Sequence, residues 1–419
     1  MAILKSQPRK LMLVAAEASG DALGAGLIQA LNTQAPGAFT YVGVGGARMK
    51  EQGVQSPFDI AELSILGLVE GLKALPRVKA RVRDTVALAL REKPDAVVLI
   101  DSWGFTLRAA QAIRKALPGI PLVKYVGPQV WAARPGRAKT LAAAVDLLIA
   151  LHPMDPPFFE AQGLKTVVVG NPALHVDMSK ADPKAWRKAQ GLAPDTDILL
   201  VLPGSRPAEI RHMMPVFGEV MTRLHRQRPD LVFVMPLADT VKAQVIEALK
   251  AVPAPVRVVE GETGKYSAMK AATLALACSG TVSTELALAG CPMVIAYKLE
   301  ALTMWIYKRI STLKHATMFN IMVDKRIAPE FIQEEATADR LLKAVTERLD
   351  DPALRARQVA EQFDALDVMG RGQEPPAGKA AAALLEFLAP RERQVLKTDA
   401  LSDEDIALIA NAEYGAKPK

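Results

Sequence analysis

Cysteine is scarce in this chain, with only Cys278 and Cys291 among its 419 residues. Both lie beside apolar runs that we interpret as strands, so we expect reduced core thiols of a cytoplasmic protein rather than a disulfide framework. Histidine is almost as rare, and the five residues of this type are scattered with no pair at metal-ligand spacing. A metal site built from histidine and cysteine is therefore not expected.

Long apolar runs are also missing. No stretch approaches the roughly 18 residues that a membrane-spanning helix needs, and the apolar run 11–16 is too short for a signal peptide and ends at Glu17. Zinc-finger spacing, an RNP-type aromatic motif and a basic tail are absent as well, so nucleic acid is not an expected partner. With a net charge of +7, we expect a soluble or peripheral protein that meets an anionic membrane or an anionic substrate.

Short apolar runs rich in valine, isoleucine and leucine alternate with helical patterns along the whole chain. This alternation predicts an α/β protein with two Rossmann-like, doubly wound halves facing each other across a cleft, with ligands at the carboxyl ends of the strands. The expected strands are 11–16, 40–44, 96–100, 122–126, 147–150 and 166–169 in the first half, and 198–202, 231–235, 256–259, 274–277 and 293–297 in the second.

The chain is longer than a usual single domain, and its composition shifts suggest where the domains end. Asn171 and Pro172 close the first half, and a Pro/Gly-rich break spans 370–378. We expect an acceptor and membrane-facing domain at 1–172 and a nucleotide-sugar domain at 173–375. A helix at 376–390 is expected to pack back on the first domain, followed by a charged tail at 391–419.

The segment 273–297 reads as a strand, a turn of small residues, a helix and a second strand. Small residues such as Gly280 and Thr281 let backbone amides approach an anion, and the hydroxyls of Ser283 and Thr284 can cap a helix or bind phosphate. Glu285 falls where a carboxylate can reach a ribose diol. The alternative is an ordinary βαβ turn with a capped helix.

A second such turn follows the apolar run 198–202. Gly204, Ser205 and Arg206 stand between a strand and a helix, where Arg206 can hold a diphosphate through paired, charge-assisted bonds. Glu209 and Arg211 are expected on the solvated face of that helix. Together the two turns predict a nucleotide diphosphate site in the second half, which leaves the first half for an acceptor.

Acidic residues end two strands of the first half. Glu17, Ser19 and Asp21 follow the run 11–16 without the GxGxxG order of a dinucleotide fingerprint, so they are either helix caps or groups that bind sugar hydroxyls or accept a proton. Asp101 ends the apolar run 96–100, where partial burial would raise its pKa toward that of a general base. The alternative for Asp101 is a cap of the following helix.

An apolar face beside a basic cluster is typical of shallow membrane insertion. The segment 62–83 carries such a face, followed by basic residues with no acid between them. On sequence alone a core-facing helix with solvated charges is slightly favoured over membrane contact. Segment 299–310 is a second candidate. The apolar positions are Ile65, Leu68, Val69 and Leu72, and the basic ones Lys73, Arg77, Lys79, Arg81 and Arg83.

Five motifs stand out along the chain, namely 17–21 (EASGD), 127–131 (GPQVW) with Arg134, 203–206 (PGSR), 283–287 (STELA) and 329–333 (PEFIQ). Jointly they resemble the bacterial lipid-A-disaccharide synthase family over about 11–388. The family implies a GT-B fold and an inverting transfer, without metal or cofactor, from UDP-2,3-diacylglucosamine to 2,3-diacylglucosamine 1-phosphate. The products are the β-1,6 disaccharide 1-phosphate and UDP, made on the cytoplasmic face of the inner membrane. A homodimer is one assembly it allows.

The resemblance also implies roles for single residues. It supports Asp101 as the base that activates the acceptor hydroxyl, with Glu17 and Asp21 in reserve, and a nucleotide site at the two turns of the second half. The implied substrate-binding residues are Ser19, Gly20, Gln129, Trp131, Arg134, Asn320, Glu330 and Gln333.

Three departures from the family pattern stand out. Ser102, Trp103 and Gly104 replace a small residue, proline and aspartate, and no proline precedes Asn320. The tail is also longer than typical. Two alternatives stay open: another GT-B enzyme on a UDP-sugar, similar to UDP-GlcNAc 2-epimerase or a muramyl-type transferase, and a non-catalytic paralogue that binds nucleotide-sugar or lipid.

Overall fold

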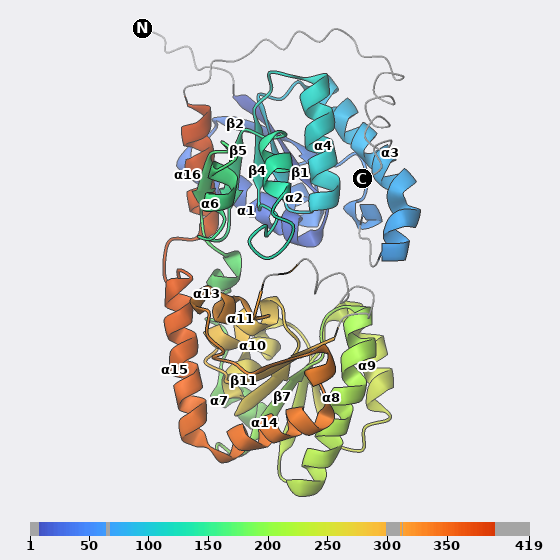
Figure 1. Ribbon diagram of the computed structural model, residues 1–419, viewed down its shortest axis with the longest axis vertical. Helices are drawn as coiled ribbons and strands as arrows, with labels where there is room; N and C mark the ends of the chain where they lie inside the picture. The colour runs from blue at the N-terminus through green and yellow to red at the C-terminus, as the bar shows by residue number, and fades with distance from the viewer. Residues whose placement is uncertain (1–7, 64–67, 299–310, 312, 390–419) are drawn as a thin grey trace. The chain divides into compact units, whose positions relative to one another are not determined.

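The computed structural model describes residues 8–63, 68–298, 311 and 313–389. They form two compact units, the first built from residues up to Gly170 together with those from Glu374 onward, and the second from Asn171–Gln373. The expected tail at 391–419 lies outside the described residues. Each unit is an α/β sheet with helices on both faces (Figure 1).

The sheet of the first unit has six strands in the order β2-β1-β3-β4-β5-β6, and every neighbouring pair is parallel. Their apolar runs are buried on both faces, as a parallel sheet covered by crossover helices requires. The six strands predicted for the first half are confirmed. They are β1 (Arg9–Ala15), β2 (Phe39–Val44), β3 (Ala96–Ile100), β4 (Leu122–Tyr125), β5 (Leu147–Ala150) and β6 (Thr166–Val168).

Alternate residues of β1 face opposite helical layers. Met12 and Val14 share one core with side chains of α3 and α4, whereas Leu11 and Leu13 pack on the other face with α1 and the C-terminal α16. Arg9 also donates from Nη1 to the carbonyl of Leu388, 2.7 Å away. The unit's helices are α1 (Ala18–Gln34), α2 (Ala47–Glu51), α3 (Leu68–Glu92), α4 (Trp103–Ala116), α5 (Arg137–Ala142), α6 (Pro156–Glu160) and α16 (Pro376–Leu388), with the 3-10 turn η1 (Ile60–Leu63).

The second sheet has the order β12-β11-β10-β7-β8-β9, again all parallel. Its sixth strand, β12, was not predicted, because a three-residue strand that begins with a buried glutamate carries no apolar pattern. The strands are β7 (Ile198–Leu202), β8 (Val232–Pro236), β9 (Val256–Val259), β10 (Leu274–Ala277), β11 (Met293–Tyr297) and β12 (Glu330–Ile332).

Prolines and side-chain caps start several helices of this unit. The Asp182 carboxylate accepts from two backbone amides of the first turn of α7, and the Asp351 carboxylate caps α15 by accepting from the amide of Leu354. The helices are α7 (Pro183–Ala189), α8 (Pro207–Gln227), α9 (Lys242–Leu249), α10 (Glu262–Ala271), α11 (Thr281–Leu288), α13 (Met318–Val323), α14 (Ala338–Asp350) and α15 (Pro352–Val368), with 3-10 turns η2 (Pro172–His175), η3 (Asp239–Val241) and η4 (Gln333–Glu335).

Strand order reverses once in each sheet. In the first unit the reversal lies between β1 and β3, where Ala15 pairs with Ile100, and in the second between β7 and β10, where Leu202 pairs with Ala277. Connections that leave in opposite directions open a crevice at the carboxyl ends of such strands. The candidate residues Glu17, Asp101 and the two small-residue turns all follow these four strands.

Candidate active site

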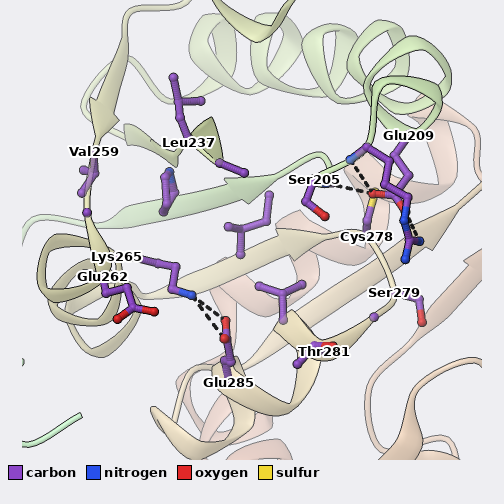
Figure 2. A pocket seen from close by; sticks show the side chains of 18 residues that line it. Ser205, Glu209, Leu237, Val259, Glu262, Lys265, Cys278, Ser279, Thr281 and Glu285 are labelled. Atoms are coloured by element: carbon purple, nitrogen blue, oxygen red, sulfur yellow. Dashed lines mark hydrogen bonds and ion pairs between the residues drawn. The ribbon is translucent and has the colours of Figure 1, made fainter. Parts of the chain in front are cut away.

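A pocket of about 490 Å³ opens at the strand reversal of the second unit (Figure 2). The turns after β7 and β10 form much of its wall, and the starts of α8, α10 and α11 supply charged and hydroxyl groups. Its volume falls within the range of small-molecule sites. The lining residues are Leu202, Gly204, Ser205, Arg206, Glu209, Pro236, Leu237, Ala238, Val259, Gly261, Glu262, Lys265, Cys278, Ser279, Gly280, Thr281, Val282 and Glu285.

The turn after β7 is fixed by its own carboxylate. Glu209 Oε2 accepts from the backbone amides of Ser205 (2.9 Å) and Arg206 (3.3 Å), and Oε1 accepts from Arg206 Nη1 (3.1 Å) and the Tyr297 hydroxyl (3.2 Å). The glutamate side chain reaches these groups because Gly204 has a φ of +119° and leaves no Cβ in the way.

The structure corrects the sequence prediction for Glu209. Its side chain is buried, whereas we expected it on the solvated face of α8; Arg211 is exposed as expected. The amides of Ser205 and Arg206 already have a partner, so the anion-binding group that this turn offers is the guanidinium of Arg206, 65% of whose side chain is exposed.

The turn after β10 lines the pocket with its backbone and with Thr281, whereas two of the predicted hydroxyls do not reach it. Ser283 Oγ donates to the carbonyl of Gly280 (2.7 Å), and the Ser283 and Thr284 side chains are buried away from the pocket. Gly280, Thr281 and Glu285 do line it. At the start of α11 the Ser283 amide donates to the Gly280 carbonyl (3.1 Å), and the preceding amides of Thr281 and Val282 are the ones suited to phosphate oxygens.

Glu285 forms an ion pair that the sequence did not predict. Lys265 Nζ lies 3.0 Å from Glu285 Oε2 and 3.2 Å from Oε1, and it stacks on the Tyr266 ring at 4.4 Å. Both partners face the pocket in Figure 2. Lys265 is one of several lysines on helical patterns, and no local signal in the sequence marks it. The pair holds the carboxylate at the pocket wall in a fixed orientation.

In the first unit, the structure brings the ends of β1 and β3 together. Ser19 Oγ donates to Asp101 Oδ2 over 3.2 Å, and both residues keep solvent access. Glu17 is exposed and makes no side-chain cap on α1. Asp101 and Ser102 have positive φ values of +50° and +40°. Asp101 does not cap the following helix through its side chain, so its carboxylate stays available at the strand reversal.

Two other predicted residues are used by the fold itself. Asp21 is buried, and its carboxylate accepts from the amides of Gly46 (2.7 Å), Arg48 (2.9 Å) and Met49 (3.0 Å). Because it is buried and accepts from three backbone donors, Asp21 does not fit the reserve role of proton acceptor. Gly20 is a packing residue, because a Cβ there would lie 3.3 Å from Ala15 Cβ.

The 127–134 loop carries one anchored and two exposed candidates. Trp131 Nε1 donates to the buried Asp155 carboxylate (2.9 Å) and its ring packs edge-on against His152 at 5.8 Å. Burial raises the pKa of Asp155 to about 6 and lowers that of His152 to about 4. Gln129 and Arg134 are exposed, so the loop presents them from a fixed base.

Asn320 and Glu330 hold a loop of the second unit. The Asn320 amide, fully buried, donates to the carbonyl of Ala328 (3.0 Å) and accepts from the amide of Ile327 (2.9 Å). Glu330 accepts from the amide (2.6 Å) and hydroxyl (2.7 Å) of Thr317. Both were predicted to bind substrate, and the structure instead gives them buried positioning roles. Gln333 is half-buried with a φ of +55°.

The predicted membrane segment is described only in part. Ile65 and segment 299–310 lie outside the described residues, as do the side chains of Leu68, Val69, Leu72 and Lys73. Arg81 departs from the prediction, because its guanidinium pairs with Glu62 (2.8 Å) and Asp84 (2.7 Å). Over the described part of the chain, no helix combines the length and apolar character needed to cross a membrane.

Solved structures share the architecture at low sequence identity. A putative UDP-N-acetylglucosamine 2-epimerase from Listeria monocytogenes superposes with a TM-score of 0.64 at 16% identity, covering 93% of this chain and 99% of that one. The glycotransferase of kitacinnamycin gives a TM-score of 0.60 at 16% identity, with 91% and 100% covered. At such identities the likeness concerns the fold, and it confirms the GT-B class.

Sequence comparison is more specific. The family model described as lipid-A-disaccharide synthetase matches residues 11–383. The lipid-A-disaccharide synthase of Rhodospirillum centenum is 40% identical over 385 residues, covering 92% of this chain and 96% of that protein. The enzyme of Paramagnetospirillum magneticum is 41% identical over 386 residues, with 92% and 99% covered. The family resemblance found in the sequence motifs is thus confirmed, and the chain belongs to the lipid-A-disaccharide synthetase family of glycosyltransferases.

Proposed function

We propose that the chain transfers 2,3-diacylglucosamine from UDP-2,3-diacylglucosamine to the 6-hydroxyl of 2,3-diacylglucosamine 1-phosphate, with inversion at the anomeric carbon. The acceptor oxygen forms the new bond to that carbon, the bond to the diphosphate breaks, and the hydroxyl proton passes to Asp101. The observation that carries this proposal is the solvent-accessible Asp101 carboxylate at the strand reversal of the first unit, held by Ser19.

The donor's nucleotide is assigned to the pocket of the second unit. Arg206 faces the departing diphosphate and stabilises its growing negative charge, aided by the amides at the start of α11. The Glu285 carboxylate, oriented by Lys265, accepts from the ribose hydroxyls. These roles are supported by where the groups line the pocket, and by the strand reversal that creates it.

Turnover with both lipid substrates tests this function directly. We expect disaccharide 1-phosphate and UDP in equal amounts, with β configuration at the new bond. The epimerase alternative predicts interconversion of UDP-N-acetylglucosamine without acceptor, and the paralogue alternative predicts UDP binding with no product. Either of those results with correctly folded protein would overturn the proposed reaction.

Membrane contact at an anionic surface on the cytoplasmic face is part of the proposal, because both substrates carry acyl chains. Arg77 and Arg83 on α3 are exposed, whereas Arg81 is already paired within the protein. Flotation with anionic and neutral liposomes at low and high salt measures this contact. We expect binding that needs anionic lipid and weakens with salt; equal binding to neutral liposomes at both salts contradicts the electrostatic part.

A further inference from the structure

A lysine lies inside the first sheet. Lys124 is the third residue of β4, pairs with Leu99 of β3, and only 2% of it is exposed. Its ammonium donates to the backbone carbonyl of Asp101 and, over 2.7 Å, to the Thr106 hydroxyl. A long charged side chain thus reaches from the sheet to the turn that carries the proposed base.

That turn is an unusual one. Asp101 and Ser102 are consecutive non-glycine residues with φ of +50° and +40°, a conformation that costs free energy at each position. The Thr106 hydroxyl lies 2.6 Å from the Asp101 carbonyl and 2.9 Å from the Ser102 carbonyl. Lys124 and Thr106 together bind the carbonyl oxygens that this left-handed turn directs into the protein.

Stability does not account for a lysine at this position. Burial lowers the pKa of Lys124 to about 7, which means that the site disfavours the charged ammonium. An apolar side chain of similar length would fill the same space without that cost. The lysine differs from such a residue in the hydrogen bonds it donates to the turn and in its charge, which is attracted to that of Asp101.

We propose that Lys124 is a positioning residue for the glycosyl transfer: with Thr106 it holds the Asp101–Ser102 turn in its left-handed form, so that the Asp101 carboxylate stays at the strand reversal beside Ser19. This role rests on the proposed function of Asp101. In this role the lysine acts on the backbone of Asp101 and Ser102, and it does not contact the substrate itself.

The test compares Lys124→Met with the parent enzyme in kcat, KM and melting temperature. We expect kcat to fall roughly 10- to 100-fold, the scale of a misplaced catalytic group, with both KM values and UDP affinity unchanged and the melting temperature equal or higher. A fold made less stable, with kcat unchanged per folded molecule, overturns the proposal.

Thr106 provides a second, milder pair of variants. Thr106→Val removes the hydroxyl at constant shape and should lower kcat, whereas Thr106→Ser keeps it and should retain activity. These two variants test the positioning role even if Lys124→Met does not fold. Equal kcat values in the two Thr106 variants contradict the proposal.

Asp101→Asn separates this proposal from the proposed function. If Asp101 is the base, the single Asp101→Asn variant is impaired and adding Lys124→Met lowers kcat no further, because the lysine acts through Asp101. Normal activity of Asp101→Asn refutes the proposed base. An impaired Asp101→Asn beside a fully active Lys124→Met refutes only the positioning role.

Discussion

The turns after β3 and β7 occupy equivalent places in the two sheets and present side chains of opposite charge. Each joins a buried strand to a helix at the strand reversal of its sheet, and each must fix a distorted backbone while keeping one charged group accessible. The first turn presents the carboxylate of Asp101, and the buried ammonium of Lys124 donates to its backbone carbonyl. The second presents the guanidinium of Arg206 and is bound by the carboxylate of Glu209.

The difference follows from which backbone groups each turn directs inward. The left-handed Asp101–Ser102 pair turns carbonyl oxygens into the protein, and these need donors. The turn at Gly204 directs the amides of Ser205 and Arg206 inward, and these need an acceptor. In both, the buried group is opposite in charge to the one presented, so the pair also sets the electrostatic environment of the exposed member.

Removing the presented carboxylate should have the largest effect. Asp101→Asn keeps size and most hydrogen bonding but cannot accept the hydroxyl proton, so we expect turnover to fall about 100-fold or more, with UDP binding unchanged. Steady-state kinetics and calorimetric titration with UDP measure both. The control is Asp84→Asn, whose carboxylate pairs with Arg81 on α3. Near-normal turnover of Asp101→Asn would transfer the role to Glu17.

Removing the presented guanidinium should come next. Arg206→Ala takes away the side-chain cation that the β7 turn offers to the diphosphate, and we expect turnover to fall by a factor on the order of 100, with weaker UDP binding. Arg211→Ala is the matched control, an exposed arginine of the same helix outside the pocket. Equal loss in the two variants would mean that general surface charge, rather than this turn, attracts the donor.

Neutralising the buried acceptor of the second turn should have a smaller effect. Glu209→Gln keeps the shape of the side chain but loses charge-assisted bonds to Arg206 and to the turn amides, so we expect UDP affinity to fall about 10-fold. Glu219→Gln, an exposed glutamate of the same helix paired with Arg223, is the control. Tighter UDP binding would contradict the comparison, because it would show that the Glu209 carboxylate competes with the diphosphate.

Much of the fold could be predicted because its strands are apolar runs of ordinary length. The strand β12 was missed because Glu330 is buried by bonds to a distant loop rather than by apolar character. The pattern of apolar residues in the sequence does not show that hydrogen bonds to another segment will satisfy a buried carboxylate. The positions of Asp101 and Arg206 could be predicted, since charged residues in the turn that follows a buried strand lie at the carboxyl edge of the sheet.

The partners of these residues could not be predicted in the same way. The helical spacing of Glu209 predicts a solvated position. That spacing carries no information on Gly204, whose missing Cβ leaves room for the Glu209 side chain to reach the turn. Lys265 is one of many helical lysines. Lys124 did leave a signal, a lone lysine within the buried run 122–126, since a charge that breaks a local rule often marks a functional site.

The smallest expected effect concerns stability and its dependence on pH. Burial lowers the pKa of Lys124 from 10.5 to about 7 in the folded protein. Between these two values the unfolded chain binds more protons than the folded one, so this lysine makes stability rise with pH in that window. Below about pH 7 both states are protonated, and the cost of the buried charge is fully present.

Lys124→Met removes this titration. Its melting temperature should therefore exceed that of the parent by a few degrees at pH 6, and the difference should shrink by pH 9, because the parent gains stability as the ammonium loses its proton. Calorimetry of both proteins at the two pH values measures this, with the exposed Lys139→Met as the control that should show no such convergence. A constant difference between the two pH values would mean that the lysine keeps its charge, which strengthens its bond to the Asp101 carbonyl and makes the first turn a closer electrostatic counterpart of the second.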